Sequence, residues 1–535
     1  MTDLDNDSFT DPYTDPYTDP YTNDSYHSCE GDEDLLVKSD WDSSNQTNSA
    51  RSSKRTSEDT LENSVEVPEF TVEELINKIG VGKWQILFVS VLALNNLSEN
   101  VAIQCQPYLS ARLYVDMELT PHLQGILGAA SLAGFSVSNA SWGFVADQIG
   151  KKNALLLCCL VVIVFNLLTC VAPDVYWIIV CRVGVSLTSG AFSIGIPCFA
   201  EMLPTKYTWF GPLFGNQLCG NVLGGLVPMI LGLFLLSDPK ISWKLFVIAC
   251  TVPSVLFFVL GLFILHETPS YLVSRGKTDE ATKLLKKMAN SRKIDLPGQF
   301  EFRKPQQDAN QIVAESRLTF RQSISVMFKN WGIMRTALCA IMMGTACRMI
   351  NLGLNFVLTN VVFLVGDVGS YCDGGHSRTY ILSKWDYGKL MMSQLTGVLA
   401  WFFIIPTINS TTGGVNLRRN ALAMFIIILF LGSWLYLCPT PLLAVGILAA
   451  CKMLSQAINT SVWINISKMY PPRIRSSLIG LTTCLMALPL PVFPYLVELF
   501  SKESHYYVTS LIMGVYLYGF IGALLAPKVV HAVEI

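Results

Sequence analysis

Twelve long apolar runs constrain the fold of this chain more than any other feature of its sequence. A bilayer core about 30 Å thick is crossed by roughly 20 apolar residues of helix. The composition agrees, because 51% of the 535 residues are hydrophobic, only 15% are charged and the mean hydropathy is +0.42. We therefore predict an all-α membrane protein with twelve transmembrane helices. The expected crossings are residues 84–107, 122–146, 153–172, 175–198, 210–236, 243–265, 336–364, 388–408, 420–438, 441–467, 476–499 and 506–527.

The first 80 residues differ in charge from the rest of the chain. They hold 20 Asp and Glu against five Lys and Arg, a net charge of −15, which leaves +13 for the remainder of a chain whose net charge is −2. With three tandem TDPY copies between Thr10 and Tyr21 and few apolar residues, this segment cannot form a core. We predict a disordered acidic tail, placed in the cytosol because no signal peptide opens the chain. Its acidic stretch from Glu30 to Leu36 is interpreted either as a sorting signal for trafficking adaptors or as a solvating patch.

Basic residues predict the orientation of the crossings, because short cytosolic loops retain Lys and Arg. A cytosolic N-terminus and twelve crossings place both termini in the cytosol. The loops then expected to be cytosolic are rich in basic residues, and the translocated loops are poorer in them. The cytosolic set includes Lys151, Lys152, Lys206, Arg418, Arg419, Arg473, Arg475 and seven basic residues between Arg275 and Lys293.

The crossings divide into two halves of six. The sequence from Val180 to Phe192 in crossing 4 is echoed by Ala450 to Val462 in crossing 10, which pairs Arg182 with Lys452. Parallel six-helix repeats with a substrate site between them describe one transporter architecture. We therefore expect a tail over residues 1–80, a six-helix bundle over 81–266, a cytosolic linker with short helices over 267–332 and a second bundle over 333–535.

The loop between crossings 2 and 3 carries the strongest local motif, GFVADQIGKKN. Its glycines, Gly143 and Gly150, permit a tight turn between two helix ends, and Lys151 and Lys152 follow. An ordinary basic turn is the plain interpretation. The pattern resembles the signature loop of the major facilitator superfamily, which implies the major facilitator fold.

The signature loop is expected to take part in a cytosolic gate. Asp147 of this loop can lie against the N-terminal end of crossing 11, where Arg475 stands. Such a contact would close the cytosolic side in one state and break in the other. We assign Glu201 and Lys206, which follow crossing 4, to the same gate.

A narrower resemblance rests on four stretches. They are FTVEELINKIGVGKWQ before crossing 1, Glu99 within it, FAEMLP after crossing 4 and ETPSYLVSRGKTDEA after crossing 6. Together they resemble the synaptic-vesicle-two-related proteins, neighbours of the organic cation and anion transporters. The chain departs from that pattern at Asn96, where relatives carry Asp, at Lys468, and in the second-half copy of the signature loop, which lacks its Asp.

Four ionisable side chains lie near the middle of apolar crossings: Glu99, Arg182, Arg348 and Lys452. A charge at this depth costs roughly 2.5–3.5 kcal/mol on insertion scales, so each needs a partner or a task. The superfamily resemblance implies that their crossings, 1, 4, 7 and 10, line the central substrate cavity. Neutral polar residues are expected beside them: Asn96 and Gln106, on one face of crossing 1 with Glu99, and Asn351 and Asn355 in crossing 7.

Three positive charges against one negative favour an anionic or zwitterionic substrate. Two further interpretations of these residues stay open. Glu99 and Arg182 can form a structural salt bridge while Arg348 is bonded to backbone, which leaves Lys452 unexplained. Alternatively, Glu99 can carry protons, since burial raises the pKa of a carboxyl group and a nearby Arg lowers it.

No catalytic motif is present, and no metal spacing, cofactor motif or nucleic-acid surface is found. We therefore expect a non-enzyme without a cofactor. The first hypothesis is a secondary transporter of a small organic ion that works by alternating access in the lipid bilayer, with coupling to protons or counter-ions. The second is a vesicle membrane protein that acts in trafficking or partner binding through its acidic tail. The resemblance favours an intracellular synaptic or secretory vesicle membrane over the plasma membrane.

Overall fold

The structure is a computed structural model, and its described residues are helical almost throughout. They are residues 69–188, 192–207, 210–294, 301–302, 328–366, 382–408, 413–437, 441–469, 475–500 and 505–526. Residues 1–68 of the acidic tail, the loop at 367–381 and most of the linker after residue 294 lie outside them, whereas residues 69–80, which the sequence assigned to the disordered tail, form a short strand and a helix.

The first half consists of helices that follow the six expected crossings. Crossing 1 is divided at Cys105, just before Pro107, and crossing 5 begins as a π-helix. The elements are α3 (Lys83–Gln104), α4 (Gln106–Asp116), α5 (Pro121–Ile149), α6 (Lys151–Cys170), α7 (Val175–Ser186), α8 (Phe192–Met202), η2 (Thr205–Tyr207), η3 (Pro212–Leu223), α9 (Gly224–Leu235) and α10 (Trp243–Ile264).

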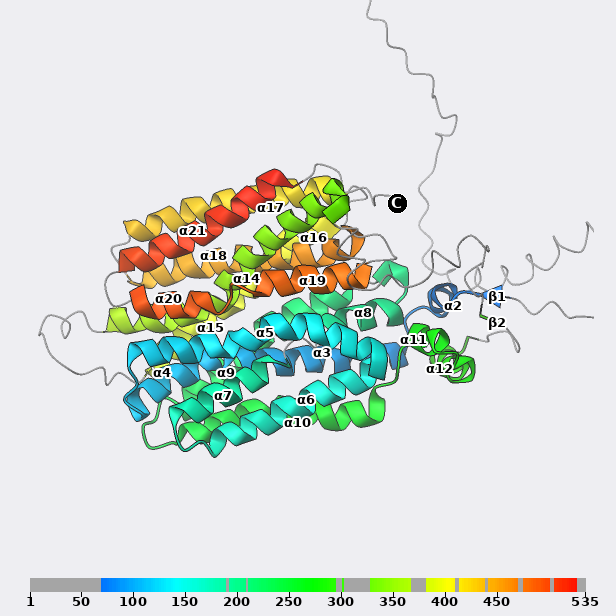
Figure 1. The fold of residues 1–535 in the computed structure, drawn as a ribbon, viewed down its shortest axis with the longest axis horizontal. Coiled ribbons are helices and arrows are strands. Elements are labelled where there is room, and N and C mark those ends of the chain that lie inside the picture. Colours follow the sequence, from blue (N-terminus) through cyan, green and yellow to red (C-terminus); the bar gives the residue numbers. More distant parts are fainter. Residues whose placement is uncertain are drawn as a thin grey trace, which may run out of the picture. The chain divides into compact units, whose positions relative to one another are not determined.

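The second half repeats this arrangement, with a long continuous helix as its first crossing. Figure 1 shows the blue-to-green helices of the first half side by side, and the helices of the second half, from the light-green α14 to the red α21, as another group. The elements are α14 (Trp331–Gly366), α15 (Lys384–Leu399), α16 (Trp401–Ile408), α17 (Gly413–Ser433), η4 (Trp434–Tyr436), α18 (Pro441–Met469), α19 (Arg475–Ala487), α20 (Val492–Phe500) and α21 (His505–Leu525).

Ten segments of the described chain are long and apolar enough to cross a membrane. The two expected crossings outside this set coincide with α5 and with α7 followed by α8. The helical membrane fold is therefore confirmed, and the count of twelve stays a prediction. Large apolar side chains on the outer surfaces, such as Phe263 at 79% and Leu437 at 81% exposure, agree with a lipid surround.

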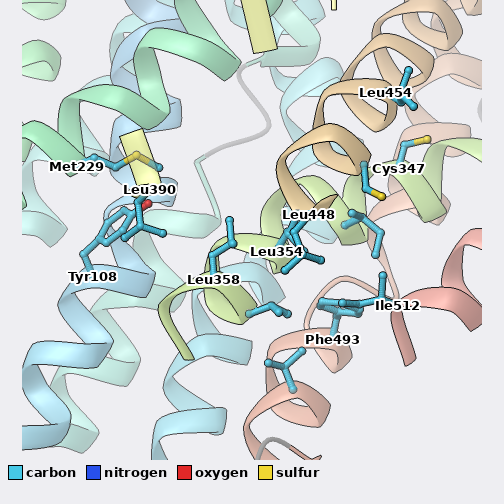
Figure 2. Close-up of a cluster of buried hydrophobic side chains, with 14 of the residues drawn as sticks. Tyr108, Met229, Cys347, Leu354, Leu358, Leu390, Leu448, Leu454, Phe493 and Ile512 are labelled. Atoms are coloured by element: carbon cyan, nitrogen blue, oxygen red, sulfur yellow. The ribbon is translucent and has the colours of Figure 1, made fainter. Parts of the chain in front are cut away.

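The two halves meet along two seams. α5 packs against α19 and α20, and α15 packs against α9 and η3. One buried core spans both halves, and Figure 2 shows Tyr108 and Met229 of the first half beside Leu390 of the second. At Gly232 an added Cβ would lie 2.5 Å from Tyr387 Cε1, so glycine allows the close approach of α9 and α15.

Five glycines in and just before crossing 5 lie in a stretch of small residues, a pattern that favours close helix packing over ligand binding. They are Gly211, Gly215, Gly220, Gly224 and Gly225. A Cβ at Gly215 would lie 2.6 Å from Phe199 Cζ, and one at Gly224 would lie 2.5 Å from Asn100 Cβ. Side chains at these positions would push α3 and α8 away from crossing 5. The packing interpretation of the glycines is therefore confirmed.

A small subdomain lies beyond the ends of crossings 1 and 6. It comprises α2 (Val72–Ile79), α11 (Pro269–Ser274), α12 (Thr278–Arg292) and the parallel pair β1 (Glu69–Phe70) and β2 (Glu301–Phe302). Thr71 and Glu74 form a capping box at the start of α2. At the other end of α2, Arg292 of α12 donates to the Ile79 carbonyl at 3.2 Å. The stretch before crossing 1 therefore packs on the linker helices.

Arg112 of α4 holds the loop between crossings 5 and 6. The buried guanidinium donates to the carbonyls of Leu236, Asp238, Pro239 and Ile241 at 3.0–3.4 Å, and to Asp116 at 2.9 Å. One side chain thus satisfies several backbone acceptors at the end of α9.

We expect Arg112→Ala to destabilise the protein by about 2–4 kcal/mol, because it removes the donor of one buried and three partly buried carbonyls and the partner of Asp116. The thermal midpoint of the purified protein in detergent measures the effect. Arg335→Ala is the control, since the exposed Arg335 donates to a single carbonyl, that of Leu525. Equal midpoints for the two variants would contradict the assignment.

Candidate functional site

All four predicted mid-membrane charges are buried. Glu99 lies on α3, Arg182 on α7, Arg348 on α14 and Lys452 on α18. Arg182 and Lys452 are each 1% exposed. They do not converge on one point, and each has its own surroundings.

Lys452 is bonded only to neutral side chains in the described part of the chain. Its Nζ donates to Asn355 Oδ1 at 2.7 Å and to Gln394 Oε1. Asn355 Nδ2 in turn donates to Gln104 Oε1 at 3.2 Å, and Gln394 Nε2 donates to the Asn221 carbonyl. The ammonium group therefore lies within a chain of amides that joins α14, α15 and α18 to α3 and η3 of the first half.

Gln217 of η3 extends this chain of amides along the seam. Its Oε1 accepts from Thr460 Oγ1 at 2.7 Å and from Asn221 Nδ2 at 3.2 Å. Its Nε2 donates to Gln456 Oε1 at 3.3 Å and to the Gly397 carbonyl at 3.2 Å. We call the connected set the central polar network. Its members are Gln104, Gln217, Asn221, Asn355, Gln394, Lys452, Gln456 and Thr460.

Glu99 and Arg182 do not form the salt bridge considered from the sequence. Glu99 Oε1 accepts from Asn95 Nδ2 at 2.7 Å. Arg182 Nη1 instead lies 3.4 Å from Asn166 Oδ1 and 3.6 Å from Cys105 Sγ. Cys105 is six residues beyond Glu99, about 9 Å along a helix at 1.5 Å per residue, so Arg182 lies at a different depth.

Arg348 is held by aromatic rings rather than by backbone. Its guanidinium carbon lies 4.5 Å from the ring centre of Trp463 on α18 and 5.5 Å from that of Phe135 on α5. Phe135 belongs to the first half and Trp463 to the second. Arg348 therefore contributes a cation–π contact across the boundary between the halves, and its Nη1 makes no hydrogen bond within the described chain.

Several predicted site amides are buried with unused hydrogen-bonding groups. Asn96, Gln106 and Asn351 have neither side-chain polar atom bonded within the described residues. An unsatisfied buried polar group costs about 1–3 kcal/mol, so these amides suit contact with water or a polar substrate. Gln106 belongs to α4, beyond the break at Cys105. Asn96 faces Gly195 and Gly215, whose added Cβ atoms would lie 3.2–3.4 Å from its amide.

Hydrogen bonds and an ion pair join the signature loop to Glu201 at the end of α8 and to the start of the linker. Lys151 Nζ pairs with Glu201 Oε1 at 2.5 Å, and the Lys151 backbone N–H donates to Glu267 Oε2 at 3.0 Å. Gly150 has φ +95°, and an added Cβ there would meet the Glu267 carboxylate. Burial raises the pKa of Glu267, and hydrogen bonds from the backbone of Lys152, Lys151 and Asn153 oppose the rise. The side chains of Asp147 and Arg475 lie outside the description, so the expected contact with crossing 11 stays a prediction.

Comparison with known proteins supplies the family. The family described as "Sugar (and other) transporter" matches residues 84–530. The chain belongs to this family. It is a transporter of the major facilitator superfamily and, as the sequence predicted, it resembles the synaptic-vesicle-two-related proteins.

Relatives from animals and plants agree with this family. The "Synaptic vesicle 2-related protein" of Bos taurus is 23% identical over 458 residues, which cover 83% of this chain and 78% of that protein. "Organic cation/carnitine transporter 7" of Arabidopsis thaliana is 24% identical over 230 residues, 43% of this chain and 45% of the relative. Both support a multi-pass membrane transporter.

A solved transporter shares the fold. The proton:xylose symporter XylE bound to 6-bromo-6-deoxy-D-glucose matches with a TM-score of 0.61 at 17% identity, over 82% of this chain and 94% of that one. At this identity the match shows the fold alone. The predicted major facilitator fold is therefore confirmed.

The sequence-based site omitted most of the central polar network. Asn355 and Lys452 were predicted, but Gln104, Gln217 and Gln394, which connect the two halves, were not. The sequence does contain a feature that points to them, because each of these glutamines lies inside an apolar crossing. Amide side chains, like charged ones, need hydrogen-bond partners inside the membrane, so a glutamine within an apolar crossing indicates a buried polar contact.

Proposed function

We propose that this protein is a secondary active transporter of a small organic ion, with an anion or zwitterion preferred. The observation that carries the proposal is the surroundings of Lys452, a fully buried ammonium group bonded to two amide oxygens. A buried charge without an opposite charge is costly. A substrate carboxylate at this position would supply that charge.

The other buried cations support the same preference. Arg182 contacts Asn166 and Cys105, which are neutral partners, and its Nε and Nη2 make no hydrogen bond in the described chain. Arg348 lies between aromatic rings. Glu99 is the carboxylate expected to offset them, and it accepts from Asn95. Our proposal therefore keeps the excess of three buried positive charges over one negative charge that the sequence predicts for the cavity.

We propose alternating access as the mechanism, with the central polar network as one of the contacts that change. The bonds from Asn355 to Gln104 and from Gln217 to Gln456 each join the first half to the second. They are single hydrogen bonds between neutral groups, with a typical net contribution of about 0.5–1.5 kcal/mol each. Contacts of this size can break and re-form when one half rocks against the other.

Substrate screening tests the proposal directly. Purified protein in detergent should be melted with a panel of small carboxylates, amino acids, quaternary amines and sugars. Hits should then be followed by uptake into proteoliposomes. We expect the largest thermal shifts among carboxylates and amino acids. Stabilisation by quaternary amines or neutral sugars alone would contradict the preference for an anion or zwitterion.

We further propose a vesicle membrane location and coupling to protons or counter-ions. The vesicle-related names of the relatives support the location, and the buried carboxyl group of Glu99 supports proton coupling. Sorting by adaptors on the acidic tail belongs to the same proposal and is separable from transport.

Deletion of residues 1–65 should leave uptake in proteoliposomes within about twofold of the full chain. The reason is that the described crossings and the small subdomain begin only at residue 69. In cells, the same deletion is expected to change the membrane in which the protein is found. Loss of uptake by the purified deletion variant would favour a protein that acts through its tail.

A further inference from the structure

One group of side chains lies where three membrane helices reach the same boundary. α3 begins at Lys83, α6 begins at Lys151 and α10 ends at Ile264. Trp84, Lys152 and His266 therefore lie at the level where a helix leaves the hydrocarbon core. Lys287 of α12 reaches the same place, since its Nζ is 3.4 Å from His266 Nε2 and 6.0 Å from the Trp84 ring centre. We call these four residues the boundary cluster.

The geometry of His266 holds Lys287 in place. The Nδ1 of His266 lies 2.7 Å from the Ile264 carbonyl oxygen, which can only accept, so Nδ1 carries the proton. In the neutral ring, Nε2 is then free to accept a hydrogen bond from the Lys287 ammonium group. Trp84 packs edge-on against the imidazole at 5.6 Å. Burial, with smaller contributions from Lys287 and Lys152, lowers the pKa of His266, which agrees with a neutral ring.

The nearby carboxylates are bound elsewhere. Glu201 pairs with Lys151, and Glu267 accepts from backbone N–H groups at the start of α6. Within the described chain, Lys152 and Lys287 have no ion pair with a carboxylate. The two ammonium groups near the imidazole thus have no ion pair of their own, because the neighbouring Glu267 carboxylate is bonded to backbone N–H groups, and an added anion could pair with them.

An apolar surface adjoins the boundary cluster. Phe263, three residues before His266, is 79% exposed, Leu262 is 47% exposed, and Leu157 of α6 is 42% exposed. In the membrane this surface contacts acyl chains. A ligand that combines a phosphate with acyl chains fits both parts.

We propose that the boundary cluster binds the phosphate of an anionic phospholipid, with the acyl chains on the exposed faces of α6 and α10. Lys152 and Lys287 neutralise the headgroup, and Trp84 lies at the headgroup level. The basic loops predict that this boundary is cytosolic, and anionic lipids are concentrated in that leaflet. The binding site is separate from the central polar network and does not depend on the transported substrate.

Lipid titration of the full-length protein tests the proposal. The protein in neutral detergent is melted with increasing phosphatidylserine, phosphatidylcholine or inorganic phosphate. We expect phosphatidylserine alone to raise the melting temperature. The double variant Lys152→Gln and Lys287→Gln should need about thirtyfold more phosphatidylserine for the half-maximal shift, at roughly fivefold per lysine. A double change of Lys283→Gln and Lys286→Gln removes the same charge from exposed positions of α12 and should leave the titration unchanged.

Each alternative result overturns the proposal. Equal weakening in the two double variants would mean that net charge alone attracts the lipid. An equal shift with phosphatidylcholine would remove the requirement for an anion, and a full shift with inorganic phosphate would remove the requirement for a lipid. The variant Lys152→Arg and Lys287→Arg keeps both charges and should retain the phosphatidylserine shift. If it does not, the loss in the glutamine variant reflects damaged packing.

Discussion

Replacing Lys452 with alanine should reduce uptake of an organic anion by about 10-fold to 100-fold and should leave uptake of an organic cation far less affected. The ammonium group is buried, and its described partners, Asn355 and Gln394, are neutral. A hydrogen bond to a charged group contributes roughly 1.5–3 kcal/mol, and the substrate carboxylate would lose this contact. Uptake of labelled anions and cations into proteoliposomes measures the two effects.

A second substitution separates the charge of Lys452 from its packing. Gln394→Glu places a carboxylate against the intact lysine, so that Lys452 is neutralised inside the protein. We expect anion uptake to fall here also. Lys389→Ala is the matched control, because Lys389 already has a carboxylate partner, Asp386, at 3.3 Å. Equal losses of anion and cation uptake in Lys452→Ala would contradict an anionic substrate.

Replacing Glu99 with glutamine should abolish uptake driven by a pH gradient while sparing exchange of substrate across the membrane. The carboxyl group is buried on α3 and accepts from Asn95, and glutamine keeps its size without a titratable proton. Arg182, which the sequence offered as one possible ion-pair partner of Glu99, contacts Asn166 and Cys105. We propose that Glu99 takes up and releases the coupled proton, because it is a titratable carboxyl group buried within crossing 1.

The control for Glu99 is another buried carboxylate. Glu498 of α20 is as buried as Glu99, and Glu498→Gln should leave the response to a pH gradient unchanged. Uptake should be measured with and without an imposed gradient, and exchange should be measured at equal pH on both sides. An unchanged gradient response in Glu99→Gln would remove proton coupling through this residue.

The membrane fold could be predicted because its causes are local in the sequence. Backbone groups in hydrocarbon must be satisfied within their own helix, so long apolar runs define the crossings with little help from tertiary contacts. The signature loop at Gly143 to Asn153 then identified the superfamily. The breaks within crossings were not predicted. Crossing 1 is divided at Cys105 and crossing 5 begins as a π-helix, because local packing decides such features.

The site was predicted in part. All four mid-membrane charges are buried, and Lys452 and Asn355 are joined by a hydrogen bond. The partners of the other charges were not predicted, since partner choice depends on depth and on the facing helix. Arg182 meets Asn166 of α6, and Arg348 meets Phe135 and Trp463. The spacing of residues along one helix does not indicate which residue of a neighbouring helix each charged side chain will contact.

The class of the protein, its expected crossings and the residues too polar for the bilayer could all be inferred from the sequence alone. Each of these follows from the transfer cost of single residues and short runs, which is a property of composition along the chain. Which polar groups contact one another depends on the packing of the helices in three dimensions. The hydrogen bonds of Gln104 and Gln217 reach residues of the second half that lie between 180 and 251 positions away along the chain. Such contacts depend on how two helix bundles are placed against each other, and glycines such as Gly232 and Gly397 set how closely the helices approach.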